Sequence, residues 1–327
     1  MKVKYGILLV SILASVACKE EEEKTNNFSS AIPSREAITI QTPESQNHNA
    51  LTIGERSEYY TLTRAITLSV NVLIVGIFSI LEDIIALPPT TIDGNKAIWG
   101  PGDDGDALNP SLYRLVVIEQ SPNIYSYTLA FRNKNLPENE DSYQNLISGT
   151  ADKTSGVNDG FGTMTLFVDN WGVADGRNCG TGKLDVSYDT ATEPQKLEVG
   201  FISFSTCEDP DELIDDAQYY YDRFVDGSGN FQFSANNDLQ EGAIVPAVNE
   251  RFEVRSRWDA TGAGRSDVRI SGGDLPKIAE IITASECWDS KFTLVYATID
   301  PDFVDQNRLI GELADCVFAD TSLPAKH

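Results

Sequence analysis

Five arginines on one predicted hairpin are the residues whose type and spacing most suggest a binding site. They are Arg251, Arg255, Arg257, Arg265 and Arg269. The first three alternate along one predicted strand and the last two along the next, so side chains within each set share a face. Guanidinium groups bind carboxylates and phosphates through paired hydrogen bonds, which makes the group a candidate anion site. The alternative is a solvated face of cross-strand ion pairs, because Glu253, Asp259 and Asp267 lie among the arginines.

Acidic side chains crowd a second candidate site, the loop that follows residue 92. The candidate calcium ligands there are Asp93, Asp103, Asp104 and Asp106. Carboxylate oxygens in a glycine-containing loop suit calcium. The spacing differs from that of an EF-hand loop, which needs a glutamate at its twelfth position. We therefore favour the alternative of a solvated acidic loop.

Sequence patterns typical of catalytic sites are weak in this chain. The only histidines are His48 and His327, and neither is placed to act as a base held by a third packed residue. Residues 176–183 (GRNCGTGK) differ from a phosphate-binding loop in glycine spacing, and no Ser or Thr follows Lys183. No pair of carboxylates stands out among the 50 acidic residues as the pair that glycoside cleavage requires. We therefore expect a non-enzymatic protein with no catalytic residue and no cofactor.

The cysteines predict an oxidising environment. Setting Cys18 aside leaves Cys179, Cys207, Cys287 and Cys316, and an even number in an exported chain indicates disulfides. We favour Cys179–Cys207 and Cys287–Cys316 among the possible connectivities, because each pair is closest in sequence. A zinc site is less consistent with the sequence, since no CxxC spacing occurs.

The charge balance argues against polyanionic partners. The chain has 25 Lys and Arg against 50 Asp and Glu, which gives a formal net charge of −25. Such a chain does not bind nucleic acid or an anionic membrane surface through its overall charge.

The elements that would position these residues are mostly strands. Alternating apolar runs separated by turn-forming residues are typical of antiparallel strands. The runs are 111–120, 124–133, 161–169, 183–188, 196–206, 218–226, 230–235, 250–259, 265–271, 281–287 and 292–298. Because no helices intervene, they predict a wide antiparallel meander.

One long apolar segment precedes the strands. Residues 62–87 have apolar side chains at helical spacing and end at Pro88-Pro89, which predicts a helix buried over most of its circumference. A transmembrane helix remains open, since residues 65–81 carry no charge. A strand is a third interpretation, although the apolar pattern exceeds the usual strand length. We expect a mainly β (α+β) fold in which the sheet curls into an open barrel around this helix.

The N-terminal residues predict where in the cell the protein is located. Residues 1–17 have a positively charged start, an apolar run and small residues before Cys18, which is the pattern of a signal peptide. The sequence ASVAC at its end resembles the lipobox of bacterial lipoproteins, although Ser15 replaces the preferred leucine. This resemblance implies lipidation at Cys18 and a location in the bacterial cell envelope, with the outer membrane favoured. The polar residues 18–56 predict a lipid-anchored disordered tether, and residues 57–323 a single β-rich domain.

Three further stretches resemble a group of predicted bacterial lipoproteins with no assigned activity: PPTTIDGNKAIWG, SRWDATGAGRSDVRISGGDL and SECWD. The resemblance implies one co-folded unit and no catalytic residue. Taken together, the sequence predicts an envelope lipoprotein that binds a hydrophobic small molecule or lipid in a helix-plugged barrel. Two alternatives stay open: a structural or surface-interaction lipoprotein with a filled core, and a carboxylate-based hydrolase.

Overall fold

The computed structural model describes residues 28, 31–33, 38–43, 56–103, 109–156, 160–177, 179–205, 207, 214–237, 248–275, 280–300, 310–320 and 323. The predicted signal peptide and the predicted lipidation site Cys18 lie outside these residues. Asp104 and Asp106 of the predicted calcium loop do so as well.

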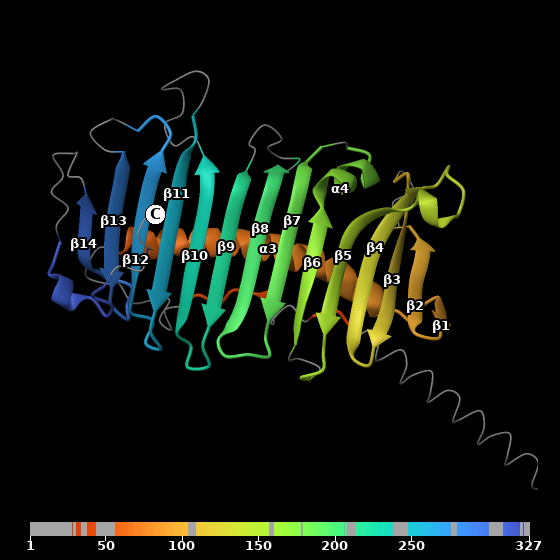
Figure 1. Ribbon diagram of the computed structural model, residues 1–327, viewed down its shortest axis with the longest axis horizontal. Coiled ribbons are helices and arrows are strands. Elements are labelled where there is room, and N and C mark those ends of the chain that lie inside the picture. The colour runs from red at the N-terminus through yellow and green to blue at the C-terminus, as the bar shows by residue number, and fades with distance from the viewer. Residues whose placement is uncertain are drawn as a thin grey trace, which may run out of the picture.

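One antiparallel sheet of fourteen strands runs through the described residues, and its strands pair in sequence order. They are β1 (Thr91–Asp93), β2 (Lys96–Gly102), β3 (Ser111–Ser121), β4 (Ile124–Asn133), β5 (Gln144–Asp152), β6 (Phe161–Phe167), β7 (Thr181–Asp189), β8 (Gln195–Ser205), β9 (Asp215–Arg223), β10 (Gly229–Asn237), β11 (Glu250–Trp258), β12 (Gly264–Gly272), β13 (Ile281–Trp288) and β14 (Leu294–Asp300). The predicted mainly β meander is therefore confirmed. The predicted barrel is not: the sheet stays open, with β1 and β14 as its two edges (Figure 1).

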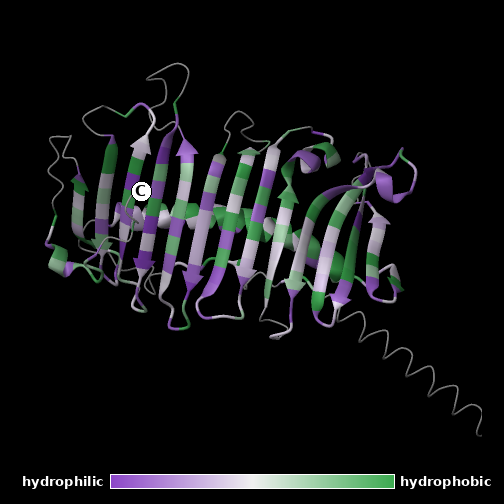
Figure 2. Cartoon of the chain, viewed as in Figure 1, coloured by the Kyte–Doolittle hydropathy of each residue, from purple (hydrophilic) through white to green (hydrophobic). Residues whose placement is uncertain are grey.

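Alternation along the strands divides the sheet into two faces. In β4, Tyr125, Tyr127 and Leu129 are buried, whereas Ser126 and Thr128 between them are more exposed. We call the face that carries the buried side chains the inner face and the opposite one the outer face. Figure 2 shows the resulting change between hydrophilic and hydrophobic colour along single strands. One covered face and one solvated face are what an antiparallel sheet allows.

A single long helix, α3 (Glu58–Ile85), crosses the strands on the inner face (Figure 1). It begins four residues before the predicted start and ends ahead of Pro88. At the far end of the helix, the Trp99 indole in β2 donates a hydrogen bond to the Leu87 carbonyl, with an N–O distance of 2.7 Å. The helix therefore lies across most of the width of the sheet and links strands that are distant in sequence.

A buried carboxylate determines where α3 begins. The Ser57 hydroxyl accepts a hydrogen bond from the Tyr60 amide at 3.0 Å, as an N-terminal cap does. Glu286 of β13 accepts hydrogen bonds from the Ser57 hydroxyl at 2.7 Å and from the Tyr59 amide at 3.0 Å. A negative charge at this end of a helix also interacts favourably with the helix dipole. Because Glu286 is distant in sequence, the periodicity of residues 62–87 did not indicate this start.

The expectation that α3 is buried over most of its circumference is wrong. Val70, Ile74 and Leu81 pack into the core, but Leu68 and Val72 are 64% and 67% exposed. The physical reason is the open sheet, which covers the helix from one side only. By length and composition α3 is also apolar enough to cross a membrane, yet 33% of its most apolar stretch is buried inside the domain.

The described part of the predicted tether packs on the domain. Residues 38–43, which we call the N-terminal strap, lie against α3. The Asn71 side chain both accepts from the Ile40 amide at 2.9 Å and donates to the Ile40 carbonyl at 2.8 Å. The Tyr221 hydroxyl makes a similar pair of hydrogen bonds with the backbone of Gln41.

Burial in this segment corrects the tether prediction. Phe28, Ala31, Ile32, Ile38 and Ile40 are all buried in the same core as the inner face of the sheet. The prediction of a disordered tether over residues 18–56 is therefore wrong at these five positions. The polar composition around them concealed the isolated apolar side chains that supply the burial.

Both favoured disulfides are present. Cys179 and Cys207 are bonded, as are Cys287 and Cys316. The first follows the short helix α4 (Val168–Ala174). The second attaches the C-terminal residues 310–320 to β13.

Candidate functional site: an apolar groove beside the crossing helix

An apolar groove runs along one side of α3, where the inner face extends past the helix. We call it the α3 groove, and its volume is about 460 Å³. Its lining residues are Ala65, Ile66, Ser69, Val70 and Leu73 of the helix, with Phe201, Phe204, Ile214 and Phe233 of the sheet. Nearly all of these side chains are apolar, and the volume falls in the range of small-molecule sites.

Two phenylalanines from the strands that flank β9 line the groove. They are Phe201 in β8 and Phe233 in β10. The β9 residue paired with Phe201 is the buried Ala217, whereas the one paired with Phe233 is the buried Tyr219. The two rings therefore belong to different cross-strand rows of the sheet.

An irregularity in β8 places a second aromatic side chain of this strand in the lining of the groove. Residues three apart in a regular strand point to opposite faces, yet Phe201 and Phe204 both line the groove and their rings meet edge to face at 5.3 Å. Ser203 between them has φ 48°, and the β7–β8 register shifts at this point. The bulge re-aims Phe204 onto the inner face. A backbone bridge to Ile214 then holds Phe204 in place.

Gly182 in β7 makes that bulge possible. A Cβ atom at Gly182 would lie 2.2 Å from the carbonyl oxygens of both Ile202 and Ser203, and its φ is +84°. Only glycine accepts this conformation and this closeness without strain. Gly182 belongs to the stretch 176–183, so a glycine pattern that resembled a phosphate loop serves strand geometry instead. This was the signal in the sequence for a bulge at β8.

A second and more polar pocket lies on the other side of α3, against the N-terminal strap. We call it the arginine pocket, and its volume is about 670 Å³. The strap contributes Ile40, Gln41 and Thr42, and the rest of the lining comes from Arg56, Thr61, Arg64, Ala65, Thr67, Leu68 and Asn71. Ala65 lines both the arginine pocket and the α3 groove. The two pockets therefore flank the same turn of the helix.

The five arginines predicted as an anion site come together on β11 and β12, beside acidic groups. The ion pairs are Arg251–Asp216, Arg257–Asp320, Arg265–Asp267 and Arg269–Glu253. Arg255 stands opposite Asp267 in the register of the two strands. The ion pairs agree with the alternative that the sequence left open, but Arg265, Asp267 and Arg269 are buried, so this part of the face is not solvated. Anion binding by these arginines remains a prediction.

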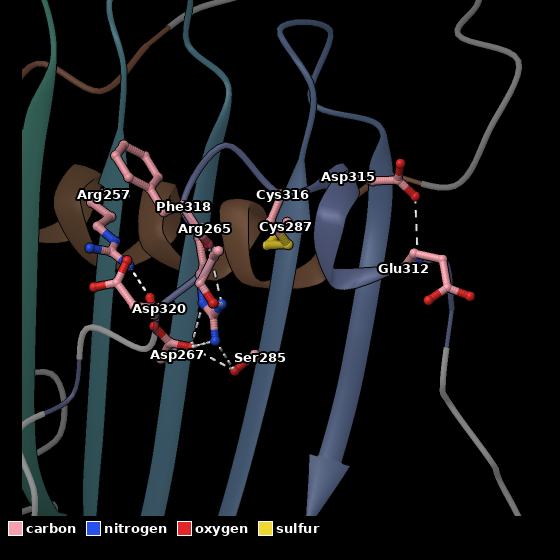
Figure 3. The surroundings of a disulfide bond; sticks show 11 residues. Arg257, Arg265, Asp267, Ser285, Cys287, Glu312, Asp315, Cys316, Phe318 and Asp320 are labelled. Atoms are coloured by element: carbon pink, nitrogen blue, oxygen red, sulfur yellow. Dashed lines mark hydrogen bonds and ion pairs between the residues drawn. A yellow bond between two sulfur atoms is a disulfide. The ribbon is translucent and has the colours of Figure 1, made fainter.

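Two of these arginines hold the C-terminal residues on the sheet (Figure 3). Arg265 donates a hydrogen bond to the Phe318 carbonyl at 3.2 Å, and the Arg257 guanidinium lies 4.6 Å from the centre of the Phe318 ring. The Cys287–Cys316 disulfide attaches the same segment to β13. The chain itself thus occupies part of the predicted anion site.

The remaining predicted site residues lie apart from the groove. Asp93 is in β1, and the Asp103 carboxylate is 4.0 Å from the Lys134 ammonium group. Within the described ranges, no group of three or more His, Cys, Asp or Glu is arranged to hold a metal ion. The calcium loop stays a prediction, because Asp104 and Asp106 fall outside those ranges.

The buried carboxylates of the described residues have structural partners. Glu286 caps α3, and Asp267 pairs with Arg265. Glu250 accepts a hydrogen bond from the Asp274 amide at 3.0 Å. Nothing in these contacts favours the hydrolase alternative.

Comparison of the chain with models of protein families, with curated proteins and with solved structures finds no match.

Proposed function

We propose that this chain is a lipid-anchored protein of the bacterial cell envelope that binds a hydrophobic ligand or lipid in the α3 groove. The single observation that carries the proposal is the apolar groove of about 460 Å³ between α3 and the inner face. Transfer of each methylene group from water into such an environment is worth about 0.8 kcal/mol. An acyl chain is therefore a suitable occupant.

The exposed side of α3 supports the same proposal. Leu68, which lines the arginine pocket, and Val72, which lines neither pocket, are exposed on the solvent side of α3. A ligand lying along the helix would cover apolar surface that is otherwise costly to expose. The sequence features around Cys18 would keep the domain close to a membrane, where such ligands are abundant. A barrel is not required, since the open sheet and the helix already form the two walls.

A second candidate function is surface interaction, in which the exposed side of α3 binds another protein. The observation that favours it is again the exposure of Leu68 and Val72. The two functions place the critical contacts differently: a ligand needs the groove, whereas a protein partner needs the outermost helix side chains.

Fluorescence titration of delipidated protein with the neutral probe N-phenyl-1-naphthylamine separates these candidates. Ser69→Trp places an indole in the groove, and Val72→Trp places the same group on exposed helix surface that lines neither pocket. We expect the first variant to lose probe binding and the second to retain it. Equal binding by both variants and the parent chain, or no binding by the parent chain, would contradict the ligand proposal.

A further inference from the structure

The N-terminal strap is held through its backbone, as a bound peptide would be. Residues 39–43 belong to no helix or strand, so their amides and carbonyls need partners elsewhere. The Asn71 side chain of α3 accepts a hydrogen bond from the Ile40 amide at 2.9 Å and donates one to the Ile40 carbonyl at 2.8 Å. The Tyr221 hydroxyl of β9 accepts from the Gln41 amide at 3.2 Å and donates to the Gln41 carbonyl at 2.9 Å. The helix and the sheet thus clasp two consecutive residues of the strap.

Two isoleucines anchor the strap beside these contacts. Ile38 and Ile40 are 1% and 4% exposed, whereas Gln41 is exposed. Ile38 lines a small cavity together with Leu197 of β8 and Tyr221. Both isoleucines belong to the same core as the inner face. The strap therefore contributes apolar side chains two positions apart, and their burial stabilises its contact with the domain.

Pro43 ends the strap at an aromatic cluster. The Tyr60 hydroxyl donates a hydrogen bond to the Pro43 carbonyl at 2.6 Å, and the Tyr60 ring stacks on Phe292 with 4.2 Å between ring centres. Gly262 makes room for the proline: its φ is +86°, and a Cβ atom there would lie 3.2 Å from Pro43 and 3.5 Å from Phe292. Docking of proline-containing segments against aromatic side chains is a recurring mode of peptide recognition. This end of the strap's site is therefore suited to a proline.

These contacts recognise a pattern rather than one sequence. All five hydrogen bonds that join strap residues 40–43 to the rest of the described chain use backbone groups of the strap. Gln41 and Thr42 also line the arginine pocket of about 670 Å³, so other side chains fit at their positions. The requirements are two apolar residues two positions apart and a proline three positions after the second.

We propose that the space occupied by the strap, bounded by Asn71, Tyr221, Tyr60 and Gly262, is a binding site for a peptide segment of a partner protein with this pattern. We call this site the strap groove. The strap is its internal ligand. Because it is attached to the domain, it competes with an effective concentration of about a millimolar, and a partner segment binds when the strap is withdrawn. The strap groove lies on the other side of α3 from the α3 groove and is independent of the ligand proposed there.

Fluorescence anisotropy with a labelled synthetic peptide of residues 36–45 (EAITIQTPES) tests the site. The receptor is the full chain with Ile38→Ser and Ile40→Ser, which removes the apolar anchors of the resident strap. We expect this variant to bind the peptide at least about tenfold more tightly than the parent chain does, because the parent strap competes. Circular dichroism checks that the variant is folded, and Ile40→Ser alone is the milder variant if the pair lowers stability.

Variants of the two clasping residues locate the bound peptide. In the same background, Tyr221→Phe and Asn71→Ala each remove a pair of hydrogen bonds and should weaken peptide binding about tenfold. Tyr220→Phe is the matched control, because Tyr220 is exposed and its hydroxyl donates to the Gln218 side chain instead. It should leave the affinity unchanged. N-phenyl-1-naphthylamine should stay bound in the α3 groove when the peptide is added.

Two altered peptides test the recognised pattern. One keeps both isoleucines and the proline in place and shuffles the other residues, and it should bind within about threefold of the parent peptide. The other moves both isoleucines one position toward the C-terminus and should lose binding. Equal binding of this second peptide, or no effect of Tyr221→Phe and Asn71→Ala, would overturn the inference.

Three further results would also contradict it. If the folded variants bind no peptide, the strap groove accepts no segment from another molecule. If the parent peptide binds and the shuffled one does not, the strap is a structural clasp of this chain alone. Displacement of the naphthylamine probe would place the peptide in the α3 groove. The proposed function fails separately, when the probe itself does not bind.

Discussion

Glu286 is the residue on which the placement of α3 depends most. Its carboxylate is almost fully buried and accepts hydrogen bonds from Ser57 and Tyr59, so it joins the first turn of the helix to β13. Replacing one partner of a buried charged contact leaves the other without its hydrogen bond. We expect Glu286→Gln to lower the free energy of unfolding by about 1–3 kcal/mol in urea denaturation.

A matched variant tests this assignment. Glu198→Gln alters an exposed glutamate on the outer face and should change stability little, since exposed surface positions seldom matter. Ser57→Ala should destabilise by about 1 kcal/mol. Combined with Glu286→Gln it should cost less than the sum of the two effects, because the residues share one network. Strict additivity would contradict the shared cap.

The buried tyrosines predict how stability depends on alkaline pH. Burial raises the pKa values of Tyr127, Tyr188 and Tyr219 above their usual range. Their contribution to stability is complete below the unfolded pKa of about 10 and falls as the pH rises above it, because only the unfolded chain then ionises readily. We expect phenolate absorbance from these residues to appear together with loss of structure. Ionisation of every tyrosine in the native state would contradict their burial.

At the scale of single elements, β8 shows why the groove exists. Phe204 reaches the inner face only because Ser203 is left-handed and because Gly182 permits close approach of the strands. We expect Gly182→Ala to destabilise the fold by about 1–3 kcal/mol through strain and to weaken probe binding. The measurements are urea unfolding and fluorescence titration.

Gly200→Ala is the control for this prediction. Gly200 lies in the same region of the sheet, in β8, and a Cβ atom there would meet nothing within 4 Å. This variant should keep the stability and the probe affinity of the parent chain. If both variants behave alike, the bulge is not what aims Phe204 into the groove.

Periodicity in the sequence predicted most elements but not all of them. The eleven predicted strands correspond to strands of the sheet, because their alternation is regular. The strands β1, β2 and β5 were missed, the last because Ser148, Gly149 and Thr150 have the composition of a turn. In the structure Gly149 makes room for a ring: a Cβ there would lie 2.4 Å from the Tyr127 side chain. Its role depends on a neighbour from another strand, which a single-strand pattern does not contain.

The site was harder to predict than the fold, for a related reason. The helical spacing of residues 62–87 indicated apolar surface, but the groove also requires Phe204 on the inner face, which the bulge at Ser203 provides. Whether the sheet stays open or closes into a barrel depends on whether its two edge strands pair, and the alternation within single strands does not determine that. The disulfides were predictable because each cysteine bonds to its nearest partner in sequence.

On the scale of the whole molecule, the protein is a broad sheet whose inner face is crossed by α3 and whose outer face carries the more polar side chains (Figures 1 and 2). The N-terminal strap lies on the crossed face, on the opposite side of α3 from the groove. An anchor at Cys18 would keep this domain near a membrane. We expect Cys18→Ser to move the protein from the membrane fraction to the soluble fraction of the envelope, measured by fractionation and immunoblotting. Unchanged membrane association would contradict the anchor.

The most direct test of the central claim is photo-crosslinking with a monoacylglycerol that carries a diazirine in its acyl chain, followed by peptide mass spectrometry. The groove predicts crosslinks to the α3 segment that contains Ala65, Ser69 and Leu73, and to the β8 segment that contains Phe201 and Phe204. An excess of monopalmitoylglycerol should abolish them. Crosslinks spread over the outer face, or unaffected by the competitor, would contradict a hydrophobic ligand site beside α3.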